Sequence, residues 1–185
     1  MKSCLLNIKI FLILSVMLLL SCQNSLNSGD APRHLDTKCP AYAVDGIEVS
    51  CLTIKQATYV IIRIDLNAVR IKLLWRNPAG VPYNSLGEAY RQVGGDLLAL
   101  TNAGIYSEKH APEGLHIEGG MTLSPLNLAN GDGNFYWKPN GIFYVTDDGA
   151  GIIESEKFDS LNEQGGIHEA TQSGPLLVIE RIELL

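Results

Sequence analysis

The chain has 185 residues, of which 46% are hydrophobic, and its formal net charge is −6 at pH 7. This length and composition fit one globular domain with a core of its own. Because neutralising phosphates takes clustered basic side chains, the acidic balance and the lack of any Lys/Arg run argue against nucleic acid as a partner.

The first 22 residues have the pattern of an export signal. Lys2 and Lys9 supply a positive start, and Ile10–Leu20 is an apolar run too short to span a bilayer comfortably. The run closes on Leu19-Leu20-Ser21-Cys22, which resembles the lipobox of bacterial lipoproteins. The resemblance implies that Cys22 becomes the lipidated first residue of a mature chain, anchored in the membrane on the periplasmic side of the cell envelope. The alternative is a plain signal peptide that is cut nearby.

Residues 23–37 are polar, which predicts a flexible tether ahead of a domain that spans residues 38–185. Once the signal is removed and Cys22 is acylated, Cys39 and Cys51 remain in an oxidising compartment. We expect a disulfide between them, which would stabilise the fold by about 3 kcal/mol in the chain-entropy model. A free thiol pair and a zinc site are the alternatives, although no His or carboxylate partner lies at ligand spacing.

Strand and helix patterns follow along the domain. Thr58–Leu66 and Val69–Trp75, both rich in β-branched residues, predict a hairpin across a short connection. Ser85–Val93 is the best helix candidate, because Ser85 can cap it and Glu88 completes a capping box. Its apolar side chains fall on one face: Leu86, Ala89, Tyr90 and Val93. Further strands are expected at Leu97–Leu100, near Leu115–Ile117, and at Ile142–Thr146, Gly151–Glu154 and Leu176–Ile179. The prediction is an α+β fold, a mixed or largely antiparallel sheet with one or more covering helices.

Three of these strands border loops in which an amide side chain lies beside or near a glycine. Asn and Gln offer both a donor and an acceptor, and a glycine lets a ligand approach the backbone closely. One such loop is an ordinary turn, but three predict a polar site lined by strand ends. The residues concerned are Asn102, Gly104, Asn140, Gln172 and Ser173.

The sequence gives no support for a metal site or another cofactor. Asn130, Asp132 and Asn134 alternate as at the start of a calcium loop, but Phe135 and Gly141 stand where that loop needs its glycine and its bidentate Glu. We therefore expect a plain turn there. The histidines show no HExxH spacing either.

Chemistry at a glycosidic or phosphoryl bond needs carboxylates that face a cleft. Glu118 and Asp132 are the candidates for this role, and a solvated position on the surface is the alternative for each. Lys138 and Arg91 could meet an anionic group, with the same alternative.

Six short stretches carry a resemblance to a known family: Asn102–Tyr106, Glu113–Leu115, Pro125–Asn127, Gly131–Phe135, Lys138–Phe143 and Ala170–Pro175. Together they resemble the phosphodiester glycosidase family, the domain of the enzyme that uncovers mannose 6-phosphate by removing N-acetylglucosamine. The resemblance implies hydrolysis of a sugar-1-phosphodiester. If the site is complete, we expect Asn102, Asn140 and Gln172 to be substrate contacts, Gly104 to be the close-approach position, and Glu118 or Asp132 to have a carboxylate role.

Members of this family continue past the Gln-Ser-Gly-Pro strand with an Arg-Asn-Gly-type segment and a Leu-Asp-Gly-type loop. Nothing after Leu176 matches either of them, so the sequence leads us to expect a domain that is incomplete at its C-terminus. The alternatives to a hydrolase are a non-catalytic envelope lipoprotein that binds glycans and an inactive truncated remnant.

Overall fold

A computed structural model describes residues 8–13, 42–44, 46–95, 97–179 and 182–183. The chain divides into two compact units, a smaller one within residues 17–69 and a larger one formed by residues 1–16 and 70–185. Mainly antiparallel strands combine with short helices, so the fold is α+β, as the sequence predicts.

The smaller unit is an antiparallel sheet of three strands: β2 (Tyr42–Val44), β3 (Ile47–Ile54) and β4 (Ala57–Ile64). β3 and β4 pair along their whole length across a two-residue turn, in which Lys55 and Gln56 have φ of 46° and 72°. Positive φ at both central residues matches the twist of a tight hairpin. Cys51, in β3, is disulfide-bonded, while Cys39 lies outside the described residues.

The expected hairpin between Thr58–Leu66 and Val69–Trp75 is wrong. β4 pairs with β3, and β5 (Val69–Leu74) joins a different sheet. At the end of β4, the backbone carbonyl of Asp65 accepts the N–H of Val69 and its carboxylate accepts the N–H of Asn67, both at 2.9 Å. An Asx turn of this kind redirects the chain, so the next strand leaves the sheet.

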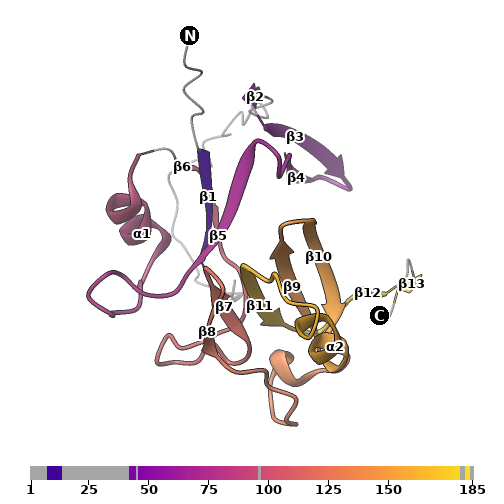
Figure 1. Cartoon of the computed structure of the whole chain (residues 1–185). Coiled ribbons are helices and arrows are strands. Elements are labelled where there is room, and N and C mark those ends of the chain that lie inside the picture. The colour runs from indigo at the N-terminus through magenta and orange to yellow at the C-terminus, as the bar shows by residue number, and fades with distance from the viewer. Residues whose placement is uncertain (1–7, 14–41, 45, 96, 180–181, 184–185) are drawn as a thin grey trace, which may run out of the picture. The chain divides into compact units, whose positions relative to one another are not determined.

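The larger unit contains a three-stranded sheet in the order β5-β1-β6 (Figure 1). β1 spans Ile8–Ile13 and runs parallel to β6, which spans Leu97–Thr101. These six residues of β1 are the described part of the expected export signal; Cys22 and the tether lie outside the described residues.

Helix α1 (Leu86–Val93) lies against β6 and begins as the sequence predicts. The Ser85 hydroxyl accepts the backbone N–H of Glu88 at 3.1 Å, and the Glu88 carboxylate accepts the N–H of Asn84 at 3.0 Å. On the apolar face Ala89 is buried, but Tyr90 is exposed, so the predicted stripe is narrower than expected. Among the described residues, no helix combines the length and apolar character needed to cross a membrane.

A second sheet of the larger unit has five antiparallel strands in the order β10-β9-β11-β7-β8 (Figure 1). Their bounds are His116–Glu118 for β7, Met121–Ser124 for β8, Gly141–Thr146 for β9, Gly149–Glu154 for β10 and Glu169–Ser173 for β11. The strands expected near 115–117, 142–146 and 151–154 are therefore confirmed. One face of this sheet carries a hydrophobic core: Leu115, Ile117, Ile142, Phe158, Ile167 and Ala170.

Short helices and a small hairpin complete the larger unit. α2 (Phe158–Asn162) contributes Phe158 to the core, and two 3-10 turns lie at Asn134–Tyr136 (η1) and Ser155–Lys157 (η2). The strand expected over Leu176–Ile179 is shorter: β12 covers Val178–Ile179 and pairs with β13 (Ile182–Glu183).

Candidate functional site

On the second face of the five-stranded sheet, strands β7 and β11 carry polar side chains, most of them buried. His116 of β7 pairs with Thr171 of β11. Because alternate residues of a strand share a face, Glu118 and Glu169 lie on the same face as these two, opposite the core. His116, Thr171 and Glu169 are buried, and the Glu118 side chain is 20% exposed. Charged and polar groups rarely fill such a layer unless they are paired, so each one's partners need to be identified.

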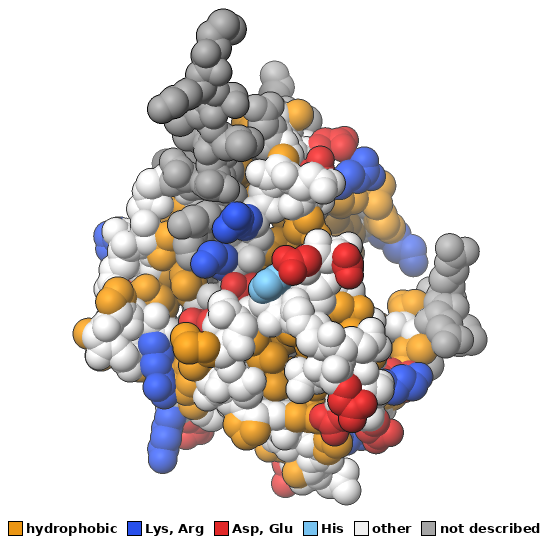
Figure 2. Space-filling view, in the orientation of Figure 1, with side chains coloured by type: hydrophobic (Ala, Val, Ile, Leu, Met, Phe, Trp, Pro, Cys, Tyr) orange, Lys and Arg blue, Asp and Glu red, His pale blue; other side chains and the backbone are white. Residues whose placement is uncertain are grey.

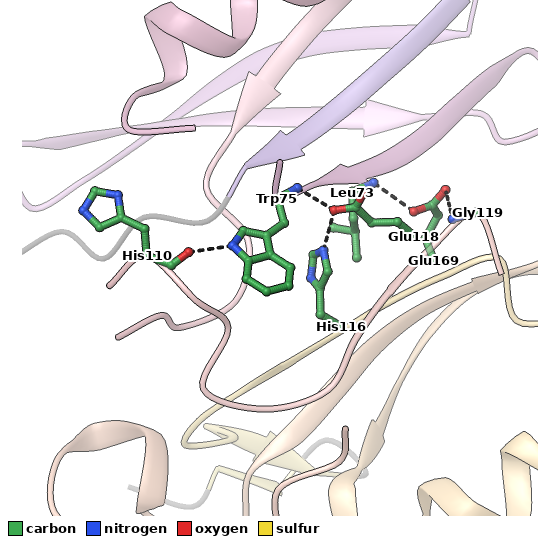
Figure 3. Close-up of polar contacts among 7 residues, drawn as sticks. All are labelled: Leu73, Trp75, His110, His116, Glu118, Gly119 and Glu169. Carbon is green, nitrogen blue, oxygen red and sulfur yellow. Dashed lines mark hydrogen bonds and ion pairs between the residues drawn. The ribbon is translucent and has the colours of Figure 1, made fainter. Parts of the chain in front are cut away.

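Glu118 is held by two donors on the same oxygen (Figure 3). Its Oε1 accepts a hydrogen bond from Nε2 of His116 at 2.7 Å and another from the backbone N–H of Trp75. Charge-assisted bonds of this kind are stronger than neutral ones and fix the carboxylate's direction. The sequence identified Glu118 as a candidate, and the structure gives it a defined orientation.

Glu169 is a second carboxylate in this layer, which the sequence did not single out. Its Oε2 accepts the backbone N–H of Leu73 at 3.0 Å, and its Oε1 accepts that of Gly119 at 3.3 Å (Figure 3). Burial raises the pKa of Glu169 and the nearby charge of Glu118 adds to this, while the two backbone donors and Lys72 lower it. N–H groups two residues apart point to the same side of a strand, so Glu118 and Glu169 together cap one edge of β5.

Trp75 connects this layer to the loop that follows β6. Its indole N–H donates to the backbone carbonyl of His110 at 2.6 Å, and its ring meets that of His116 edge-on, with centroids 6.1 Å apart. The guanidinium carbon of Arg76 lies 3.6 Å from the Trp75 ring centroid, a cation–π contact. Burial and the carboxylates of Glu118 and Glu88 raise the pKa of Tyr83, which places its phenol near the same site.

Two buried polar atoms lack a hydrogen-bond partner among the described residues: Nδ1 of His116 and Oδ1 of Asn102. Leaving a buried polar group unpaired costs about 1–3 kcal/mol, so such atoms are rare in folded proteins. His116 is the hydrogen-bond partner of Glu118, and Asn102 is one of the expected substrate contacts. Both atoms have unused capacity for a donor from water or a ligand.

Gln172 has a different position from the one expected. It lies on the core side of β11 and is 1% exposed. Its Oε1 accepts the N–H groups of Leu115 and Asn127, both at 3.0 Å, while its Nε2 donates to the Asn127 carbonyl at 2.7 Å and the Ser155 hydroxyl at 3.2 Å. A Gln side chain has no further donors, so a substrate would have to displace one of these partners.

Asn140 and Ser173 lie close to Gln172 at the ends of β9 and β11. Asn140 is 2% exposed and donates from Nδ2 to the Phe135 carbonyl at 3.2 Å. Ser173 pairs with Gly141, and by alternation it faces the polar side with Glu118 rather than the core side with Gln172. A Cβ on Gly174 would lie 2.8 Å from Cβ of Asn140, so the two loops are in close contact.

Hydrogen bonds join all six stretches of the family resemblance. The Gln172 side chain links its own stretch to Leu115 and Asn127, and the Asn127 amide returns a bond to the Glu113 carbonyl at 2.7 Å. Asn140 links its stretch to Phe135. The loop at Asn102–Tyr106 joins through the N–H of Glu113, which donates to the Ile105 carbonyl at 3.0 Å. Ser155 closes the set, since its N–H donates to the Asn140 carbonyl and its hydroxyl accepts from Gln172.

A surface pocket of about 290 Å³ opens beside Asn140. Its lining residues are Lys138, Pro139, Asn140, Glu154 and Glu156. Figure 2 shows acidic side chains gathered over η2 and α2, on this side of the molecule. Lys138 donates from Nζ to the Leu128 carbonyl at 3.2 Å, so the one cation that lines the pocket is already engaged.

The remaining candidates lie outside the strands of the Glu118 layer. Asp132 is exposed in the turn before η1, and Arg91 is exposed on α1. Gly104 is buried in the loop after β6. Within the described part of the chain, no group of three or more His, Cys, Asp or Glu side chains could hold a metal ion.

The sequence did contain a signal for the polar layer. His116-Ile117-Glu118 and Glu169-Ala170-Thr171 each alternate polar and apolar residues, as expected for strands with two different faces. The sequence pattern did not indicate that the polar side chains of these strands are also buried.

A comparison with known proteins finds a relative in Escherichia coli. The chain is 35% identical over 140 residues to "Uncharacterized protein YigE" of Escherichia coli (strain K12). The match takes in 75% of this chain and 53% of the E. coli protein, so the chain spans about half the length of this relative. No family model and no solved structure matches the chain.

Proposed function

We propose that the chain is a phosphodiester glycosidase-like hydrolase that cleaves a sugar-1-phosphodiester in the cell envelope. The observation that carries the proposal is the meeting of the six stretches of the family resemblance. They are spread over residues 102–175, yet hydrogen bonds join them around Gln172 and bring them to Leu115, directly before the His116–Glu118 pair. A rigid support beneath an oriented carboxylate is what an active site requires.

The reaction breaks the bond between C1 of the sugar and the phosphate oxygen. Water adds its oxygen to C1, and a proton from that water goes to the phosphate, which gives a free sugar and a phosphomonoester. Because the phosphodiester is already a good leaving group, the protein has to stabilise positive charge on the sugar and hold the anion. We assign the first task to Glu118, since two bonds fix one oxygen and the side chain remains partly exposed.

Neighbouring groups suit the sugar and the phosphate. With Nε2 of His116 donating to Glu118, its Nδ1 is an acceptor, as is Oδ1 of Asn102; sugar hydroxyls are donors that such atoms can bind. Arg76 lies over Trp75, whose backbone N–H binds Glu118, and a guanidinium is well suited to a phosphodiester. We therefore assign Asn102 and Arg76 to substrate binding.

The other expected substrate contacts fall into two groups. Gln172 and Asn140 act as the support of the site, because they are buried and their side chains bind other parts of the chain. Ser173 and Gly104 stay in the proposal as contacts on the substrate side. Asp132, exposed in the turn before η1, becomes the weaker choice for the carboxylate.

The proposed location is the periplasmic side of the envelope. It rests on the export-signal pattern and on Cys22 as the lipid-bearing residue. Its substrate would then be an envelope glycan or another sugar phosphodiester that reaches the periplasm, and the membrane would be a partner only through the anchor.

The proposal is tested by incubating the full chain with a nucleotide-sugar and with a synthetic sugar-1-phosphodiester and measuring the free sugar. Turnover should be abolished by Asn102→Ala. It should be unchanged by Asn130→Ala, the same substitution at an exposed asparagine. Tight glycan binding without turnover would replace the hydrolase with the binding lipoprotein. Neither binding nor turnover in a folded chain would favour an inactive remnant.

A further inference from the structure

The strand at the centre of the β5-β1-β6 sheet comes from the segment that the sequence identifies as an export signal. β1 (Ile8–Ile13) lies between β5 and β6, with Lys9 opposite Leu97 and Leu12 opposite Thr101. The same residues begin the apolar run that is expected to be cleaved before Cys22. A central strand and a removable leader are incompatible roles in the exported protein.

Removing β1 would open a gap that β5 and β6 cannot close by themselves. Neighbouring strands lie about 4.8 Å apart, so the two edges would be separated by about twice that distance. Both edges would present unpaired N–H and C=O groups, which are costly where they are shielded from water. The sheet would therefore either rearrange or take up another strand.

The other contacts of β5 and β6 limit where a new strand can pair. On the far side of β5, the N–H groups of Leu73 and Trp75 are already bound by Glu169 and Glu118, so that edge is closed. β6 is fixed by α1, which packs against it, and its residues 97–100 are only half-buried. The remaining pairing capacity of β5 is therefore directed into the position of β1, and β6 would lose β1, its strand partner among the described residues.

We infer that the position of β1 is an acceptor for an apolar strand, and that in the exported protein a segment other than the leader fills it. The occupant is an extended apolar stretch of about five or six residues, matching β5 and β6 in length, that runs parallel to β6. Parallel neighbours require a crossover connection, so the occupant does not come from a hairpin with β6. The neighbouring strands β5 and β6 are mostly apolar, which favours an apolar occupant.

The occupant comes from a region that corresponds to the part of the E. coli relative outside the match. The 140 matched residues make up 53% of the E. coli relative, which leaves nearly half of that protein outside the match. That part has ample length for a strand and the crossover leading to it. The occupant is therefore a strand from this region and not a second copy of the chain.

The experiment compares the full chain, kept unprocessed, with the chain that begins at Cys22. Hydrogen exchange of the β6 amides, Leu97–Thr101, is followed by mass spectrometry in each. Removal of the leader should accelerate this exchange by about tenfold or more, because exposed edges lose their ladder partners. The unmatched part of the E. coli protein, added as a separate polypeptide, should restore protection and form a one-to-one complex.

A peptide of residues 8–13 serves as the positive control, and the same peptide with Ile10→Pro and Leu12→Pro as the negative control, since proline cannot donate to a ladder. If the chain from Cys22 does not fold alone, the experiment instead measures whether the β6 amides become protected when each peptide or the E. coli polypeptide is added. The inference would be overturned if β6 exchange were unchanged after leader removal, or if the exported protein retained residues 8–13. It would also be overturned if a homodimer restored protection, or if the E. coli polypeptide failed to do so in either form of the experiment.

Discussion

Replacing Gln172 with leucine should strongly destabilise the larger unit, because this side chain supports the loops around the candidate site. Leucine has a similar size but accepts nothing, so the N–H groups of Leu115 and Asn127 would lose the oxygen that binds them at 3.0 Å. Each buried N–H left unpaired costs about 1–3 kcal/mol, which gives a loss of about 2–6 kcal/mol. Against a typical total of about 5–15 kcal/mol, this is a large fraction of the stability.

The assay is urea unfolding followed by tryptophan fluorescence. For a slope of about 2 kcal/mol per molar urea, the midpoint should fall by about 1–3 M. The matched control is Gln164→Leu, because Gln164 is exposed just after α2 and its side chain donates to the Ser160 carbonyl; its effect should stay within about 0.5 kcal/mol. A midpoint for Gln172→Leu that matches the control would refute the role assigned to Gln172.

Three other substitutions test the fold around the site by the same unfolding assay. Burial raises the pKa of Glu169, so the folded chain holds this proton more tightly than the unfolded chain. Wild-type stability should therefore fall as the pH rises from about 4.3 toward the raised value, and Glu169→Gln should remove this part of the pH dependence. Ser85→Ala should lower stability by about 1 kcal/mol through loss of the helix cap. Gly174→Ala should cost about 1–3 kcal/mol, because its Cβ would lie 2.8 Å from that of Asn140. In the control Gly87→Ala the new Cβ meets nothing closer than 3.5 Å, so stability should rise by about 0.5–1 kcal/mol.

Elements whose causes are local were predictable from the sequence. The start of α1 follows from Ser85 and Glu88, whose hydrogen bonds span only a few residues. β9 and β10 follow from residue type and from the turn between them, and together with α1 they are enough to predict the α+β class.

Features that depend on strand pairing were not predictable in the same way. The hairpin assigned to Thr58–Leu66 and Val69–Trp75 failed because residue type marks a strand but not its partner. The Lys55-Gln56 turn that joins β3 to β4 lacks the Asn or Gly that usually marks such turns.

The candidate site shows the same limit. An amide at a strand end indicated Gln172 as a substrate contact, but register places it on the core side, while Ser173, one residue on, faces the polar layer. Glu169 resembles a surface residue in sequence, but in the fold it is buried and its carboxylate binds the backbone N–H groups of Leu73 and Gly119. Glu118 was found by its position near the loops, but its partners His116 and Trp75 could be identified only from the fold.

The most direct measurement of the central claim is the release of free sugar from a sugar-1-phosphodiester by the full chain and its Glu118→Gln variant. Glutamine keeps an oxygen for the bonds from His116 and Trp75, so the variant should fold normally while losing the negative charge. We expect turnover by the wild type and by Glu108→Gln, an exposed control, and a loss of at least about a hundredfold for Glu118→Gln. Equal turnover by Glu118→Gln and the wild type would contradict it.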